Sequence, residues 1–342
     1  MYRCAIVGVS GGRARGHAEA YQQIQRGALV AIATRQQEKL DAFGDQFGVA
    51  ARYTDYRELF AREKPDLVHV NTPPNVRLEI FQAAEAAGIR ALIVEKPLAI
   101  EAEDYLAIRD FARTAKVKIA INHQLHFQPR RAQLQQLVQK GAIGEIRFID
   151  ASARLNMAYQ GTHTLQAIAA FMPQAKPLQI LGQVAGAAGL AETPRQHFAP
   201  DATLSTITFD NGASALLRCG PNAPYVLPGD ERSHVHKRVA VYGSRGHVAW
   251  NMWGWETNID GKLERGDHDY FAEDPLGQAA MTEAMFDWLE DDAAVHPLHL
   301  DAALQDFNIV LKTYMSALNH RSYALDDPPQ PALIAALRQQ LN

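Results

Sequence analysis

A glutamate, a lysine and a proline directly follow a short apolar run, and the lysine is a candidate for chemistry. The run covers residues 91–94, and Glu95, Lys96 and Pro97 come next. Such a run is typical of a strand buried in a parallel sheet, and open α/β sheets bind ligands at the carboxyl ends of their strands. Lys96 would then lie at the mouth of a cleft, where burial and Glu95 can both shift its pKa. The alternative is a surface turn with a solvated lysine.

A histidine in the second half of the chain is a candidate proton carrier. His163 follows Gly161 by two residues and precedes the apolar stretch 165–171, which is typical of a helix. A histidine at a helix start can face a cleft and act as general acid or base near neutral pH. The alternative is a capping or core histidine.

A glycine-rich turn near the first residues is suited to a dinucleotide. An apolar run, 4–9, leads through Gly8, Gly11 and Ala14 into a helix-like stretch. Glycines let the backbone approach a pyrophosphate, and the helix amino end offers its N–H groups to it. The turn is one residue longer than the usual G-x-G-x-x-G, and a flexible surface turn is the alternative.

The second apolar run bears on the choice of dinucleotide. Residues 29–34 form the run, which ends in Thr34 and is followed by Arg35. An acid at this point usually holds the ribose 2′-hydroxyl of NAD, whereas an arginine suits the 2′-phosphate of NADP. Because an arginine and no acid is present, we expect NADP as the preferred cofactor, with NAD possible. The alternative is a solvated arginine at a helix start.

Strands and helices alternate from residue 3 to about 122. This alternation predicts an α/β fold with a doubly wound, parallel Rossmann sheet. Because the carboxyl ends of parallel strands share one edge, the polar loops that follow them should collect there. These loops are 10–15, 34–35, 72–75, 95–97 and 122–124.

The second half of the chain has longer, alternating strands and hairpin turns. Asn211-Gly212 joins two such runs, and Asn-Gly is a strong hairpin signal. The pattern predicts a C-terminal α+β domain with an open, mainly antiparallel sheet of about six strands and helices on one face. The other face must be covered, so we expect a homodimer or homotetramer through this sheet. We place a Rossmann domain at 1–122 and a substrate-binding and oligomerisation domain at 123–342.

Composition limits the kinds of partner and the cellular location that the sequence predicts. The chain has 342 residues and a formal charge of -4, which favours neither nucleic acid nor a membrane surface as partner. No apolar run approaches the ~20 residues of a membrane-spanning helix. Two distant cysteines, Cys4 and Cys219, make no disulfide framework, and the chain opens directly on a strand with no signal peptide. We expect a reduced, cytoplasmic location.

Together these motifs resemble the Gfo/Idh/MocA family (glucose–fructose oxidoreductase, inositol dehydrogenase, rhizopine catabolism). The resemblance covers nearly the whole chain and rests on the turn 8–17, Thr72-Pro73-Pro74-Asn75, Glu95-Lys96-Pro97, Gly141-x-x-Gly144-Glu145, Gly161-x-His163 and Gly243-x-x-Gly246. It implies a Rossmann half followed by an open-sheet half with substrate contacts. It also implies an NAD(P)-dependent dehydrogenase or reductase acting on a carbinol carbon of a sugar, sugar acid or cyclitol.

The resemblance also implies roles for single residues. Lys96 would orient or polarise the reacting oxygen, and His163 would move the proton. The family's second motif commonly reads Asp-x-Gly-x-His-x-x-Asp, but Tyr159 and Gln166 stand at its two Asp positions here. Tyr159 can assist as donor or acceptor, although its high pKa makes it a poorer base.

Three interpretations of this departure stay open. His163 acts with Lys96 without a carboxylate; or the chain is a non-catalytic, dinucleotide- and sugar-binding regulator; or it retains NAD and uses transient oxidation as an epimerase, lyase or glycosidase does.

The expected contacts can be named residue by residue. For the cofactor they are Gly8, Ser10, Gly11, Gly12, Arg13, Thr34, Arg35, Thr72, Pro73, Asn75, Glu95, Lys96 and Asn122. For the sugar-like substrate they are Lys96, Gln124, Arg154, Asn156, Tyr159 and His163. No metal is expected, because His123-x-x-His126 and His234-x-His236 have no further ligand motif beside them. Trp250, Trp253 and Trp255 can floor a sugar site, but sheet packing or an interface is favoured.

Overall fold

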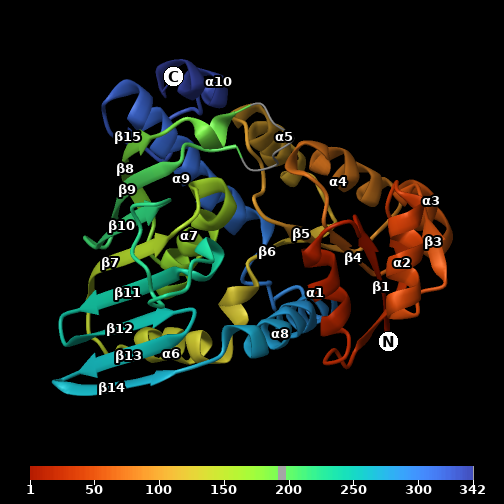
Figure 1. Ribbon diagram of the computed structural model, residues 1–342, viewed down its shortest axis with the longest axis horizontal. Coiled ribbons are helices and arrows are strands. Elements are labelled where there is room, and N and C mark those ends of the chain that lie inside the picture. Colours follow the sequence, from red (N-terminus) through yellow and green to blue (C-terminus); the bar gives the residue numbers. More distant parts are fainter. Residues whose placement is uncertain (192–197, 342) are drawn as a thin grey trace. The chain divides into compact units, whose positions relative to one another are not determined.

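The chain folds into two compact units in the computed structural model, which describes residues 1–191 and 198–341 (Figure 1). Unit 1 comprises residues 1–98, 104–127 and 271–304, and unit 2 comprises 99–103, 128–270 and the chain from 305 onward. This division differs from the expected boundary after residue 122, because the segment 271–304 from the C-terminal half is part of unit 1.

Unit 1 is built on a six-stranded parallel sheet with the strand order β3-β2-β1-β4-β5-β6. This order confirms the predicted doubly wound sheet. Only the short, half-buried edge strand β3 was not predicted, since three residues carry too little pattern. The strands are β1 (Tyr2–Val7), β2 (Gly27–Ala33), β3 (Ala51–Tyr53), β4 (Leu67–Val70), β5 (Ala91–Glu95) and β6 (Lys118–Asn122).

Helices pack against both faces of this sheet. They are α1 (Gly12–Ala20), α2 (Gln37–Phe47), α3 (Tyr56–Glu63), α4 (Arg77–Ala86), α5 (Ala102–Ala112) and α8 (Tyr270–Glu290), with short 3₁₀ turns η1 (Pro74–Val76) and η2 (Gln124–Phe127). Asp55 caps α3, as its sequence spacing predicts, because its Oδ1 accepts a hydrogen bond of 2.8 Å from the Arg57 N–H. Helix α8 is the unexpected member, as it comes from the far end of the chain.

Apolar side chains of α8 complete the core of unit 1. Met281, Met285 and Phe286 are fully buried in one cluster with Cys4 and Leu67 of the sheet. The ring of Phe286 also stacks on Tyr2 with centroids 4.4 Å apart. Burial of such side chains is worth about 1.5–3 kcal/mol each. Helix α8 is therefore part of the Rossmann core and no appendage of the second unit.

Unit 2 carries a nine-stranded sheet with the order β14-β13-β12-β11-β7-β10-β9-β8-β15. All pairs are antiparallel except β7 with β10, so the expected mainly antiparallel sheet is confirmed, but the expected number of about six strands is wrong. The sequence conceals β14, which is polar and exposed, and β15, which has two residues. The strands are β7 (Ile146–Ala153), β8 (Pro177–Ala185), β9 (Ala202–Phe209), β10 (Ser214–Cys219), β11 (Lys237–Gly243), β12 (Gly246–Asn251), β13 (Gly254–Ile259), β14 (Lys262–Asp267) and β15 (Tyr323–Ala324).

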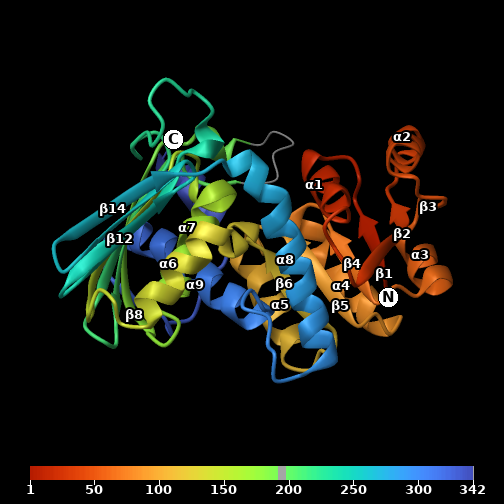
Figure 2. The ribbon, with the colours of Figure 1, turned by 90° about the horizontal axis from the view of Figure 1, so that it is seen from below.

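Helices cover one face of this sheet and leave the other bare (Figure 2). The helical elements of the unit are α6 (Pro129–Gln139), η3 (Met157–Gly161), α7 (Thr162–Phe171), η4 (Ala188–Leu190), η5 (Ser233–Val235), α9 (Leu300–Asn319) and α10 (Leu333–Leu341). The strand register places Leu181, Tyr242 and Leu263 on the bare face, and each is at least 39 % exposed. No helix within the described ranges of the chain is long and apolar enough to cross a membrane.

Candidate functional site

The carboxyl ends of the strands of unit 1 are level with one another. The register pairs Val7 with Ala33 and Val70, and Glu95 with Asn122. The loops that follow these strands therefore collect along one edge, as the sequence predicts. The expected cofactor residues all lie on this edge of unit 1, and Gln124 lies in η2 beside it.

The glycine turn between β1 and α1 fits a phosphate group. Gly8 has a φ of 91°, and a Cβ there would lie 2.9 Å from the Asn71 carbonyl oxygen, so only glycine is accommodated. At Gly11 and Gly12, by contrast, no described atom comes within 4 Å of a Cβ position. No side chain of the described residues caps the first turn of α1. The turn thus has open space in front of an uncapped helix end, which is what a pyrophosphate needs.

The end of β2 lies beside this turn. Ser10 Oγ and Thr34 Oγ1 are 3.2 Å apart, within hydrogen-bonding distance. Arg35, the next residue, is exposed. Two hydroxyls and an exposed guanidinium thus lie at the end of β2.

A buried arginine that the sequence analysis did not select lies after β4. Arg77 is 1 % exposed and donates a hydrogen bond of 3.2 Å to the Thr72 carbonyl oxygen. Its Nε and Nη1, the Thr72 hydroxyl and the Asn71 amide have no hydrogen-bond partner among the described residues. The neighbouring Pro73 is half-buried and Asn75 is exposed. The loop after β4 therefore has hydrogen-bond donors without a protein partner, on the sheet edge where the expected cofactor residues lie.

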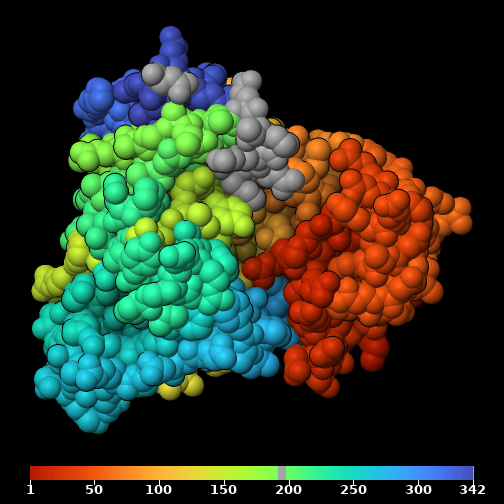
Figure 3. Space-filling view, in the orientation of Figure 1, coloured from red at the N-terminus to blue at the C-terminus, as the bar shows by residue number. Residues whose placement is uncertain are grey.

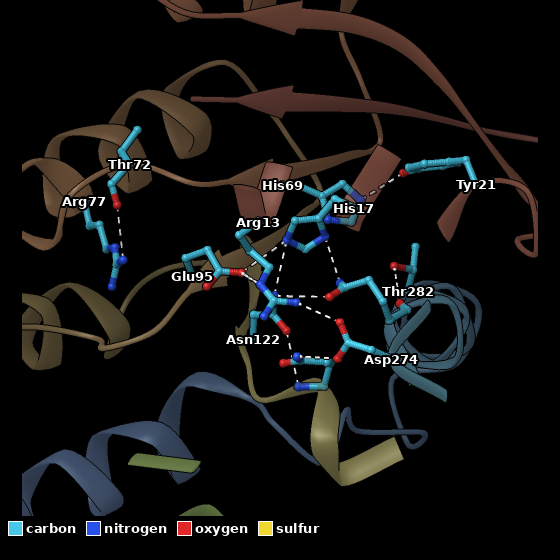
Figure 4. A network of polar contacts seen from close by, with 12 residues as sticks. Arg13, His17, Tyr21, His69, Thr72, Arg77, Glu95, Asn122, Asp274 and Thr282 are labelled. Carbon is cyan, nitrogen blue, oxygen red and sulfur yellow. Dashed lines mark hydrogen bonds and ion pairs between the residues drawn. The ribbon is translucent and has the colours of Figure 1, made fainter. Parts of the chain in front are cut away.

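Glu95 is the centre of a buried polar network (Figure 4). Its Oε1 accepts a hydrogen bond from Nδ2 of Asn122, which is its register neighbour on β6. Nε2 of His17 lies 3.4 Å from the same oxygen, and Nε of Arg13 lies 3.8 Å from it. Glu95 thus points into the unit, and the next residue, Lys96, is 9 % exposed.

Burial and charge set the protonation of these groups. Burial alone would raise the pKa of Glu95, but the hydrogen bond from His17 and the charges of Arg13 and Lys96 lower it to about 2. Burial lowers the pKa of Lys96 to about 8, against the attraction of Glu95. Burial also lowers the pKa of His17, so at neutral pH it contacts Glu95 as a neutral donor and forms no ion pair. Lys96 is a cation near neutral pH that titrates easily.

Helix α8 supplies two residues of this network that sequence reasoning missed. Asp274 accepts hydrogen bonds from Nη1 of Arg13 at 3.2 Å and from Nε2 of Gln124 at 2.8 Å. Gln278 contacts His17 and Asn122. Gln124, expected at the substrate, is 2 % exposed and spends its amide donor on Asp274. No local motif marks Asp274 or Gln278, because only the packing of α8 brings them here.

The candidate substrate residues of unit 2 collect at one edge of its sheet. Lys237 and Cys219 both pair with Ala153, so the end of β7, the end of β10 and the start of β11 are neighbours. Arg154 and Asn156 follow β7 directly. Lys237 is a buried cation at this edge that sequence reasoning missed.

Asn156 opens the turn that carries the two expected chemical residues. Its Oδ1 accepts a hydrogen bond of 2.8 Å from the Tyr159 N–H and caps the π-helical turn η3. Tyr159 is half-buried, and His163 is 4 % exposed in the first turn of α7. π-Helical turns occur frequently at functional sites. Lys96 belongs to unit 1 and His163 to unit 2, so their pairing stays a prediction.

Arg154 holds the loop 220–236, which lies on the surface of unit 2 (Figure 3). Its guanidinium lies 3.6 Å from the centroid of the Tyr225 ring and donates a hydrogen bond of 2.5 Å to the Ala223 carbonyl oxygen. Arg154 therefore helps to position this loop, and it uses only some of its guanidinium N–H groups to do so.

Gln166 has a partner inside unit 2. Its Oε1 accepts a hydrogen bond of 2.7 Å from Nη2 of Arg131, and the guanidinium of Arg131 lies 5.7 Å from the Trp250 ring centroid. Trp250 is 3 % exposed, so it packs within the unit. The second Asp position of the motif thus carries a neutral amide that is engaged by an arginine.

One histidine of the pairs considered for a metal, His236, makes hydrogen bonds to the backbone. His236 accepts from the Val226 N–H at 3.3 Å through Nδ1, and its Nε2 lies 2.7 Å from the Asp230 carbonyl oxygen. Within residues 1–191 and 198–341, no three His, Cys, Asp or Glu side chains are grouped to hold a metal ion.

Comparison with known families matches part of the chain. The model of the oxidoreductase family with an NAD-binding Rossmann fold, GFO_IDH_MocA, matches residues 2–123. This match lies on the strands and loops of the cofactor edge.

Curated relatives match less than half of the chain. D-apiose dehydrogenase of Paraburkholderia graminis is 27 % identical over 143 residues, 42 % of this chain and 38 % of that protein. The dTDP-3,4-didehydro-2,6-dideoxy-alpha-D-glucose 3-reductase of Streptomyces violaceoruber is 32 % identical over 36 % of this chain and 35 % of its own length. A D-xylose 1-dehydrogenase (NADP(+)) of Haloferax volcanii is 29 % identical over 32 % of this chain and 33 % of its own. The chain matches these relatives over less than half of their length.

Solved structures match nearly the whole chain in fold. An oxidoreductase from Agrobacterium radiobacter in complex with NAD⁺, L-tartaric acid and magnesium has a TM-score of 0.80 at 18 % identity, over 95 % of this chain and 98 % of that one. The aldose–aldose oxidoreductase of Caulobacter crescentus, complexed with glycerol, has a TM-score of 0.78 at 18 % identity, over 94 % and 99 %. At these identities the likeness concerns the fold alone.

Proposed function

We propose that the protein is an NAD(P)-dependent dehydrogenase or reductase of a sugar, sugar acid or cyclitol, because residues 2–123 match the model of the Gfo/Idh/MocA oxidoreductase family. The observation that carries the proposal is the open glycine turn in front of α1, on the same sheet edge as Lys96. The named activities of the relatives, on apiose, xylose and a dTDP-sugar, support a sugar-like substrate.

The chain's own residues supply binding and proton handling. The glycine turn would hold the dinucleotide phosphates, and the bound nicotinamide would accept or give the hydride. The Lys96 ammonium would orient the reacting oxygen and stabilise negative charge on it. His163 would take or return the hydroxyl proton, with Tyr159 assisting. Arg154, Asn156 and Gln124 would contact the sugar hydroxyls.

NADP is the proposed preferred dinucleotide. Arg35 is exposed beside the Ser10 and Thr34 hydroxyls, and these groups suit a 2′-phosphate. NAD remains possible, because the similar Agrobacterium structure contains NAD⁺ while the Haloferax relative is named for NADP⁺.

The test is the absorbance of reduced nicotinamide with a panel of sugars, sugar acids and cyclitols, run separately with NADP⁺ and NAD⁺. A rise with one polyol establishes the dehydrogenase and names the substrate class. The reverse reaction, with matching ketoses or lactones and the reduced dinucleotides, covers a reductase. No change in either direction for the whole panel contradicts the proposal.

A second candidate function is a ligand-binding regulator, or an enzyme that recycles a retained cofactor. The observation that favours it is the absence of a carboxylate at both motif positions: Tyr159 stands at one, and Gln166, bound to Arg131, at the other. Sugar binding in calorimetry without turnover supports the regulator. Dinucleotide that remains bound through purification supports internal recycling.

We further propose a homodimer or homotetramer through the bare face of the unit 2 sheet, where Leu181, Tyr242 and Leu263 are exposed. A cytoplasmic location is supported by Cys4 and Cys219, which are both unpaired thiols. No nucleic acid or membrane partner is proposed, in keeping with the net charge of -4.

A further inference from the structure

A buried imidazole that has no part in the proposed chemistry lies behind the end of β5. His17 of α1 is 1 % exposed, and its two ring nitrogens face different elements. Nε2 lies 3.4 Å from Oε1 of Glu95, and Nδ1 lies 2.8 Å from Nε2 of Gln278 in α8. Nε2 also lies 3.3 Å from Nδ2 of Asn122, whose two hydrogens are directed at Glu95 and Gln278. Its ring is tilted against that of His69, with centroids 4.3 Å apart. Figure 4 shows His17 between the strand end and α8.

The hydrogen bonds decide which ring nitrogen of His17 carries the proton. The Gln278 amide is oriented by its other atom, since its Oε1 accepts from Nδ2 of Asn122 at 3.3 Å. Its Nε2 can therefore only donate, which makes Nδ1 of His17 the acceptor. Because burial keeps His17 neutral, the single ring proton lies on Nε2 and points to Glu95.

Glu95 links the hydrogen bonds of His17 to Lys96, the candidate residue for the chemistry. Its carboxylate is held by Asn122 and His17 and faces Arg13. It is the last residue of β5, and Lys96 is the next residue in the chain. A carboxylate fixed in this way anchors the backbone that carries Lys96 and keeps one negative charge next to its ammonium.

We propose that His17 is a positioning residue: Gln278 fixes its tautomer, its Nε2–H holds the Glu95 carboxylate, and Glu95 in turn fixes the place and charge state of Lys96. The importance of this arrangement for turnover rests on the proposed function. The arrangement itself concerns only the free protein and can be tested without substrate.

The charges around this chain of contacts all have known signs. Lys96 is influenced by Glu95 and by two cations, Arg13 and Arg77. His17 is influenced by Glu95, Arg13 and Asp274. Glu95 therefore favours protonated Lys96, and Arg13 and Arg77 oppose it. If its carboxylate turns away, the two arginines dominate, and Lys96 loses its proton at a lower pH.

Two substitutions of His17 separate its two contacts. His17→Gln places an amide donor near the position of Nε2 and can still bind Glu95. His17→Asn places its amide near the position of Nδ1, so it can meet Gln278 but not reach Glu95. A positioning role predicts that kcat falls by about tenfold or more in His17→Asn and stays within about threefold of the wild type in His17→Gln. KM for the dinucleotide should change little in either variant.

The second readout needs no turnover. The rate at which acetic anhydride acetylates Lys96 is followed against pH by peptide mass spectrometry, because only the neutral amine reacts. We expect the midpoint to move down by about half a pH unit or more in His17→Asn, in the same direction as in Glu95→Gln. Gln278→Leu, which removes the donor to Nδ1, gives a smaller shift of the same sign and serves if His17→Asn does not fold.

The matched control is His69→Gln. His69 contacts the ring of His17 and lies 2.9 Å from the Tyr21 hydroxyl, but it has no described contact with Glu95. The substitution His69→Gln should lower the stability of the protein and leave the pH midpoint of Lys96 acetylation unchanged. Equal kcat in His17→Asn and His17→Gln with an unshifted Lys96 midpoint overturns the proposal. A shifted midpoint in a protein that turns over no substrate supports the arrangement and contradicts the proposed function instead.

Discussion

Lys96 is the side chain on which the proposed chemistry depends most. It directly follows β5, and the charges of one carboxylate and two arginines act on it. Lys96→Ala should lower kcat by about 10³-fold, because a positioned cation at a reacting oxygen contributes roughly this much. Dinucleotide affinity, measured by fluorescence titration, should stay within about threefold. Near-normal turnover in this variant would remove Lys96 from the mechanism.

The pH dependence of kcat/KM reports the charge of Lys96 in the free enzyme. Burial lowers the pKa of Lys96 to about 8, and the proposed role requires the protonated form. Titration of Lys96 should therefore make activity fall tenfold per pH unit above this value. Lys96→Arg, if active, should lose this limb, since a guanidinium stays charged. If kcat/KM instead rises above pH 8, Lys96 acts as a base.

Arg35 is the residue on which cofactor choice is expected to depend. Arg35→Ala should raise KM for NADP by about tenfold or more and leave KM for NAD nearly unchanged, because a charge-assisted contact to the 2′-phosphate is lost. Lys39 in α2 offers a matched control, since it is also an exposed cation. An unchanged ratio of the two KM values in Arg35→Ala contradicts the NADP assignment.

At the scale of elements, the turn between β1 and α1 uses its glycines for two different reasons. Gly8 is required by the fold, since its φ is 91° and a Cβ would meet the Asn71 carbonyl. Gly11 faces open space. Gly8→Ala should thus lower the free energy of unfolding by about 1–3 kcal/mol. Gly11→Ala should leave stability within about 0.5 kcal/mol and weaken dinucleotide binding instead.

Differential scanning calorimetry and fluorescence titration separate the two effects. If both variants lose only stability, or both lose only dinucleotide affinity, then Gly8 and Gly11 do not have the separate roles proposed here.

At the scale of the whole molecule, the C-terminal half contributes to the N-terminal fold. Phe286 of α8 is fully buried against Tyr2, and a Cβ at Gly27 would lie 2.7 Å from its ring. Phe286→Ala should therefore destabilise unit 1 by about 3–5 kcal/mol. Val295→Ala is the control, because Val295 is 51 % exposed and should change stability by less than about 0.5 kcal/mol.

Denaturant unfolding, followed together with dinucleotide binding, tests this prediction. Loss of the binding-competent unit at lower denaturant in Phe286→Ala is expected. An unchanged transition indicates that α8 does not belong to the cooperative Rossmann unit.

Local pattern was sufficient for much of the fold. Apolar runs of strand length, each followed by a polar loop, predicted the parallel sheet and the edge that bears Lys96. Asn211-Gly212 predicted the hairpin of β9 and β10. Pattern was insufficient for β14 and β15, because a polar, exposed strand and a two-residue strand bury nothing that would mark them.

The sequence by itself determined the parallel sheet, the glycine turn, the helix start at His163 and the match of residues 2–123 to an oxidoreductase family model, since each depends on neighbours in the chain. Only the tertiary structure decided which side chains surround Glu95. His17, Asn122 and Gln278 are each at least 105 residues apart from one another in the chain. No local spacing records contacts that form when α8 packs on a sheet built from the other end of the chain. The same packing places Asp274 on Arg13, because burial of Met281, Met285 and Phe286 fixes the helix.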